Sequence, residues 1–334
     1  MFIVAQFLLA LGGVTLFLIG LKFMSDNMEL LAGDKMKSLL SSCTKNNLLG
    51  VMTGAVSTAV IQSSIATNVI LVGFVSNGVM TFYQASSVIM GANIGTTITA
   101  QLVSLSGKDS FDITALGSLV AFLGFIFSFV KKKNFTEIGG VMMGFGMLFL
   151  GLDVVSESIS YFKNFEKFRS VFLVKNDFFL LFNGLLITAI VQSSSAVTSV
   201  MIILASNGLI TFENSMFLIL GANIGTCLSV ILSAIGKPIE ARRTAFFNLA
   251  FNVVGSIILF LPLTLFKSEI ANAFFRFSGS IEREIANFHT LFNLTVTLIL
   301  LPILKPFNRL IEIIICEKSD KKVEKRSILS TNTN

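Results

Sequence analysis

The chain has 334 residues, of which 53% are hydrophobic and only 13% are charged, with a mean hydropathy of +0.82. Soluble domains carry about 25% charged residues, so this composition excludes a soluble globular protein and indicates an integral membrane protein. The formal charge of +6 does not indicate nucleic-acid binding, because the basic run at 318–326 follows the last apolar segment, where cytoplasmic juxtamembrane charge is expected.

In chain order, the first half begins with a predicted span at residues 2–24, without the basic leader of a cleavable signal peptide. Residues 25–46 mix charged and apolar side chains and predict a helix in the membrane interface. The apolar stretch that follows is interrupted at Gln62, and the parts on either side are each too short to span. We therefore predict a re-entrant helical hairpin at about 47–76, followed by spans at 79–105 and 111–130.

The same pattern then begins again. A span at 135–152 and an amphipathic stretch to residue 176 precede a second hairpin at about 177–206. Further spans are predicted at 209–235, from Gly236-Lys237-Pro238 to Phe266, and at 289–315, with an interfacial segment before the last. The prediction is an all-α integral membrane protein with about seven full spans and two hairpins.

Two polar motifs recur at one offset. Gln-Ser-Ser begins at Gln62 and at Gln192, and Gly-Ala-Asn-Ile-Gly-Thr begins at Gly91 and at Gly221, each pair 130 residues apart. An isolated Ser-Ser pair in a membrane helix more often mediates packing than ligand binding, but duplication at matched spacing favours two halves of one site. The two glycines in each Gly-Ala-Asn-Ile-Gly-Thr string predict a broken helix beside a cavity.

We divide the chain into a first repeat at 1–134, a second at 135–266, an interfacial segment and last span at 267–316, and a cytoplasmic tail at 317–334. The loops assigned to one face hold 17 of the 25 Lys and Arg residues, so that face is predicted to be cytoplasmic. The N-terminus then lies outside and the C-terminus inside. The two repeats run in opposite directions, which is the plan of many secondary transporters.

The hairpin tips offer chemistry for an anion and for a cation. Amides at a helix N-terminus attract anions, phosphate included, and hydroxyl groups can add donors. Neither hairpin contains Lys or Arg, so helix dipoles and co-bound cations such as sodium would have to balance the anion. The predicted phosphate ligands are Gln62, Ser63, Ser64, Gln192, Ser193, Ser194 and Ser195. The predicted sodium ligands are Gln62, Thr67, Asn93, Thr96, Gln192, Thr198, Asn223 and Thr226.

At these motifs the sequence resembles the type II sodium–phosphate cotransporters, specifically their bacterial members. The resemblance covers roughly residues 10–310 and implies sodium-driven phosphate import by alternating access, across a bacterial inner membrane, by a homodimer. The family's third serine is replaced by Ile65 in the first repeat. Ala32-Gly33-Asp34 is similar to a tripeptide whose aspartate accompanies an additional sodium in some members.

Other functions stay open at this stage. A symporter of another oxyanion, such as sulfate or a dicarboxylate, fits the same tip chemistry, and a non-transporting sensor subunit is a third reading. An enzyme is not predicted, because no nucleophile–base pair is found in the membrane region. Cys43, Cys227 and Cys316 show no metal-ligand or disulfide spacing, and sodium as coupling ion is the one non-protein component expected. His289 is expected to be structural.

Overall fold

A computed structural model describes residues 2–42, 46–106, 112–132, 134–162 and 175–316. The predicted tail at 317–334 lies outside these residues. The described residues form helices and no strands, which confirms the all-α prediction.

Many large apolar side chains are exposed, such as Ile190 at 82% and Phe277 at 83%. Such an apolar surface is expected to face lipid.

Within the described residues, four helical segments are long and apolar enough to cross a membrane. They are 3–33 within α1 (Phe2–Ser42), α6 (Phe135–Ser160), α10 (Phe212–Gly225) taken with α11 (Cys227–Ser233), and α12 (Ile239–Leu265). A fifth is possible if α14 (Ile281–Leu300) and α15 (Leu304–Ile314) count as one span.

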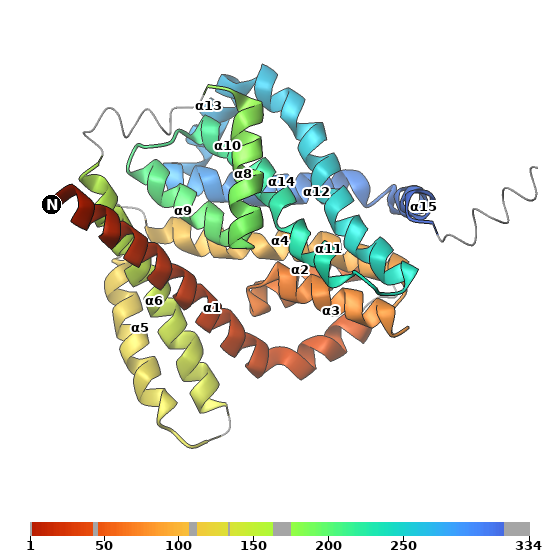
Figure 1. Cartoon of the computed structure of the whole chain (residues 1–334), viewed down its shortest axis with the longest axis horizontal. Coiled ribbons are helices and arrows are strands. Elements are labelled where there is room, and N and C mark those ends of the chain that lie inside the picture. The colour runs from red at the N-terminus through yellow and green to blue at the C-terminus, as the bar shows by residue number, and fades with distance from the viewer. Residues whose placement is uncertain (1, 43–45, 107–111, 133, 163–174, 317–334) are drawn as a thin grey trace, which may run out of the picture.

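The N-terminal segment differs from the prediction of a span at 2–24 followed by a separate interfacial helix. Residues 2–42 form the single helix α1, which curves along its length in Figure 1. The polar stretch contains one glycine, Gly33, and no proline, and a single glycine costs a helix only about 1 kcal/mol. The change in composition after Met24 therefore does not break the helix.

Two helix–turn–helix units occupy the segments for which hairpins were predicted. The first consists of α2 (Asn47–Ile61) and α3 (Ser64–Ser76), and the second of α8 (Asp177–Val191) and α9 (Ser194–Ser206). Each first helix ends at a glutamine in the left-handed conformation, with φ of 59° at both Gln62 and Gln192. Each second helix is capped by a serine, Ser63 or Ser193, whose Oγ accepts from a backbone amide three residues on.

The prediction of a broken helix was wrong for the first Gly-Ala-Asn-Ile-Gly-Thr string, whereas the second string ends at a one-residue interruption between two helices. The first lies inside the continuous helix α4 (Phe82–Val103). In the second, Thr226 separates α10 from α11 but keeps helical angles, with φ −64° and ψ −23°.

The glycines of these strings instead allow close helix packing. A Cβ at Gly91 would overlap the Val51 carbonyl of α2, and one at Gly221 would overlap the Leu181 carbonyl of α8. Gly54 and Gly184 approach the backbones of α4 and α10 in the same way. Small residues commonly allow helix backbones to pack closely in membrane proteins. Here they allow α2 to pack against α4 and α8 to pack against α10.

The remaining helices frame this centre. α5 (Ile113–Ser128) and α6 form a pair that extends away from the other helices, and α1 packs along α6 (Figure 1). α13 (Lys267–Ser278) has no buried residue and precedes α14. The last span predicted at 289–315 corresponds to α14 and α15, which meet at an angle of 88° and form one span only if the bent pair is taken together. Pro302 lies between them, and proline cannot continue the backbone hydrogen bonds of a helix.

A prediction follows from the close packing of α2 and α4. We expect Gly91→Ala to lower the free energy of unfolding by about 1–3 kcal/mol, the usual range for overpacking a well-packed core. Gly73→Ala is the matched control, because Gly73 is also helical but a Cβ there meets no atom within 4 Å. Thermal unfolding of both variants in detergent measures the difference, and equal stability would show that the helices can separate without cost.

Candidate functional site

The first turn is held by three side-chain contacts. Gln62 Nε2 donates to the Ala59 carbonyl at 2.5 Å, and Gln62 Oε1 accepts from Thr99 Oγ1 of α4 at 2.7 Å. Ser25 Oγ of α1 donates to the Ile61 carbonyl, the last of α2, at 2.8 Å. The tip is therefore fixed from α4 on one side and from α1 on the other.

The second turn has the same backbone and a different side-chain pattern. Ser193 and Ser195 place their hydroxyl oxygens 3.1 Å apart. Ser194 and Ser195 are buried, whereas Gln192 is exposed. The first turn has Ile65 where the second has Ser195, so the second turn presents one more hydroxyl.

Both turns line one cavity of about 400 Å³. All seven predicted phosphate ligands lie on its wall, although 130 residues separate the two copies of the motif. The rest of the wall comes from Ile65, Val191 and a stretch of α1. This wall of α1 consists of Leu18, Leu21, Lys22, Ser25 and Asp26.

The contribution of α1 was missed by the sequence reasoning. Lys22 Nζ lies 3.0 Å from Asp26 Oδ2, one helical turn away. A signal for these residues was available, since charged side chains within an otherwise apolar membrane segment commonly mark a functional site. The change in composition after Met24 instead predicts a boundary between a span and an interfacial helix at these residues.

Helix ends provide the electrostatics of the cavity. α3 and α9, each of 13 residues, begin at the cavity wall with Ser64 and Ser194. The first amides of a helix lack intrahelical partners and carry partial positive charge, so two such ends facing one cavity favour an anion. The left-handed turns also end α2 and α8 there, and carbonyl oxygens at a helix C-terminus favour a cation.

The other predicted sodium ligands do not line this cavity. Thr67 and Thr198 are fully buried inside α3 and α9, where Thr67 Oγ1 bonds Thr58 and Thr198 Oγ1 has no partner among the described residues. The remaining four are also buried. Asn93 and Thr96 lie in α4, Asn223 lies in α10, and Thr226 lies between α10 and α11. The backbone of Asp34 belongs to α1, and its side chain lies outside the described part of the structure.

Asn93 and Asn223 belong to a buried polar cluster. Asn93 Nδ2 donates to Asn248 Oδ1 at 3.2 Å, and Asn252 Nδ2 donates to Asn93 Oδ1 at 3.2 Å. Asn248 and Asn252 of α12 also contact Cys227 Sγ, each at 3.4 Å.

The cluster extends to α14 through a histidine. Asn223 Oδ1 lies 3.1 Å from His289 Nε2, and His289 is fully buried, as a structural histidine would be. Asn248, Asn252 and His289 were not predicted to join Asn93 and Asn223. The repeated Phe-Asn-Leu at 247–249 and 292–294 is the one sequence signal that pointed to α12 and α14.

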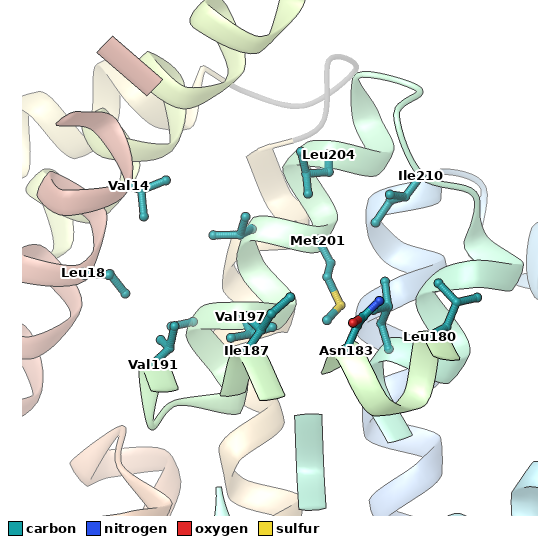
Figure 2. A pocket seen from close by; sticks show the side chains of 13 residues that line it. Val14, Leu18, Leu180, Asn183, Ile187, Val191, Val197, Met201, Leu204 and Ile210 are labelled. Atoms are coloured by element: carbon teal, nitrogen blue, oxygen red, sulfur yellow. The ribbon is translucent and has the colours of Figure 1, made fainter. Parts of the chain in front are cut away.

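A second cavity, of about 360 Å³, lies beside the first and shares Leu18 and Val191 with it. Figure 2 shows Val14 and Leu18 of α1 across from Val191, Ile187 and Val197 of the second unit. Its wall is almost entirely apolar, with Asn183 as the polar exception, so it lacks the donors that an anion requires.

Known proteins resemble the chain over most of its length. It is 29% identical over 91% of its residues to the uncharacterized protein YqeW of Bacillus subtilis, matching 97% of that protein. It is 27% identical over 95% of its residues to the putative inorganic phosphate export protein YjbB of Escherichia coli K12, matching 57% of that longer protein.

The human sodium-dependent phosphate transport protein 2B is 36% identical over 104 residues, which are 30% of this chain and 15% of the human protein. No solved structure matches the chain significantly. Residues 16–157 and 163–279 match the model of the Na+/Pi-cotransporter family, and these segments include both Gln-Ser turns and all the cavity-lining residues of α1 from Leu18 onward. The chain therefore belongs to the Na+/Pi-cotransporter family.

Proposed function

We propose that this protein is a secondary active symporter that imports inorganic phosphate together with sodium. The observation that carries the proposal is the cavity that the turns at Gln62 and Gln192 line together. Phosphate would bind between the two turns, and exposure of the cavity to one side of the membrane and then the other would carry it across.

The anion would be held by neutral donors and by two helix ends. Ser63, Ser64, Ser193, Ser194 and Ser195 supply hydroxyl groups on the cavity wall. The amides at the start of α3 and α9 add donors without a local negative charge. The second turn is the stronger phosphate contact in this proposal, because Ser195 stands where the first turn has Ile65.

Sodium would offset the charge of phosphate in a cavity that lipid surrounds. Gln62 and Gln192 are the candidate sodium ligands nearest the anion, together with the carbonyl groups that end α2 and α8. The buried set of Thr67, Asn93, Thr96, Thr198, Asn223 and Thr226 would hold sodium deeper in the core, which fits the unpartnered Thr198 Oγ1. Asp34 is a candidate for an additional sodium.

We further propose that residues 1–134 and 135–266 form two repeats of opposite orientation, with α2–α3 and α8–α9 as re-entrant hairpins. Matching turns at Gln62 and Gln192 and matching threonine caps at Thr81 and Thr211 support the repeat. Seven spans would then include α4 and α5. The inner membrane, an external N-terminus, a cytoplasmic C-terminus and a homodimer remain part of this proposal.

Export of phosphate is the second candidate function. It is favoured by the name of the Escherichia coli relative, a putative inorganic phosphate export protein. The same cavity can serve either direction, because the gradients of sodium and phosphate set the net flux of a symporter.

The proposed function is tested with the full chain reconstituted into liposomes. An inward sodium gradient is expected to drive accumulation of radiolabelled phosphate, with no accumulation when choline replaces sodium. Sulfate and succinate added in excess distinguish phosphate from another oxyanion, since they should not compete. Phosphate flux that does not depend on the sodium gradient would contradict symport. Absence of any phosphate flux would favour a non-transporting sensor.

A serine series tests the second turn. We expect Ser194→Ala with Ser195→Ala to raise the KM for phosphate about 10-fold or more, because a hydrogen bond to a charged group contributes roughly 1.5–3 kcal/mol. Ser206→Ala is the matched control, since its Oγ bonds the Ile203 carbonyl at the far end of α9. If the wild type, the double variant and the control have the same KM, phosphate binds elsewhere.

A further inference from the structure

Two charged side chains of α1 lie where a membrane helix would normally be apolar. Besides Glu29, the segment 3–33 contains Lys22 and Asp26, and it is still hydrophobic enough to span. Charged groups in such segments are costly and usually face a polar cavity or a partner. Here they do both, since they pair with each other and line the cavity of the two turns.

Both side chains of the pair line the cavity and are largely exposed. The side chain of Lys22 is 76% exposed and that of Asp26 is 55% exposed, although their charged atoms are only 3.0 Å apart. Between them in the sequence, Ser25 bonds the Ile61 carbonyl beside the first turn. This bond fixes the part of α1 that carries the pair next to Gln62.

Within the described residues, Lys22 is the one cationic side chain on the cavity wall and Asp26 the one anionic side chain. The wall thus has no net side-chain charge while the pair is intact. An anion that enters can attract the Lys22 ammonium, but it must compete with Asp26. A sodium ion beside Asp26 would weaken that competition by taking over the carboxylate.

We propose that Lys22 contacts the transported anion and that Asp26 restrains Lys22 until sodium binds. This inference rests on the proposed function and adds to it a cause for the dependence of phosphate binding on sodium. Lys22 supplies the positive charge that the two hairpins lack. Asp26 makes that charge available only in the presence of the coupling ion.

The other half of the chain offers a comparison within the same molecule. At an offset of 131 residues, which aligns Ser25 with Ser156, Lys22 corresponds to Asp153 and Asp26 to Glu157. Neither Asp153 nor Glu157 lines the cavity. The charged pair is therefore specific to α1, and α6 provides positions for control substitutions.

The test measures binding of radiolabelled phosphate to the purified full-length protein at increasing sodium, with choline keeping the ionic strength constant. The variants are Lys22→Gln, Asp26→Asn and the double variant. The controls are Lys132→Gln, in the loop before α6, and Glu157→Gln, within α6.

The variants are expected to move in opposite directions. Lys22→Gln should raise the Kd for phosphate about 10-fold or more, because a charge-assisted hydrogen bond is lost. Asp26→Asn should lower the Kd at low sodium and flatten its dependence on sodium. The double variant should bind more weakly than Asp26→Asn, and both controls should match the wild type.

Two results would overturn the inference alone, given normal binding by the wild type. One is an unchanged Kd in Lys22→Gln, which would mean that Lys22 does not contact the anion. The other is equal weakening by Lys22→Gln and Asp26→Asn, which would mean that the pair only supports α1. A wild type that binds no phosphate at any sodium concentration would overturn the proposed function as well.

Discussion

The structure depends on how two helices end inside an apolar chain. At Gln62 and again at Gln192 the backbone turns into the left-handed region, so the carbonyls that end one helix and the amides that begin the next are left without helical partners. Lipid cannot satisfy these groups. They must meet protein, water or a solute, and the fold answers this constraint by placing both turns on one cavity.

Close packing makes that arrangement possible. Gly91 and Gly221 bring α4 and α10 against the first helices of the two units, and the cluster of Asn93, Asn248 and Asn252 joins α4 to α12. Asn223 and His289 join α10 to α14. Asn93 and Asn223, which do not reach the cavity, therefore hold together the helices that surround the turns. A buried amide cluster of this kind is stable only while its hydrogen-bond partners keep their positions.

The position of the turns could be predicted from sequence because it has a strong signal. Short apolar segments around Gln62 and Gln192, at one offset, fit a paired hairpin and fit little else. Gly91 and Gly221 are compatible with two structures, a broken helix or a close contact between helices. Only the position of the neighbouring backbone decides between them.

The role of α1 was hidden for a different reason. Lys22 and Asp26 look like the end of a span when the chain is read in order, and their place beside Gln62 depends on a tertiary contact through Ser25. The bend between α14 and α15 was likewise missed, although Pro302 was available as its signal.

The central claim is that the two turns form one binding site. It is tested most directly with single cysteines at Ile65 and at Val191, which line the cavity from opposite units without being proposed ligands. Their rates of reaction with a hydrophilic thiol reagent are measured against phosphate concentration in sodium. One shared site predicts that phosphate slows both reactions with the same half-saturating concentration. Protection of one position alone, or two different concentrations, would contradict it.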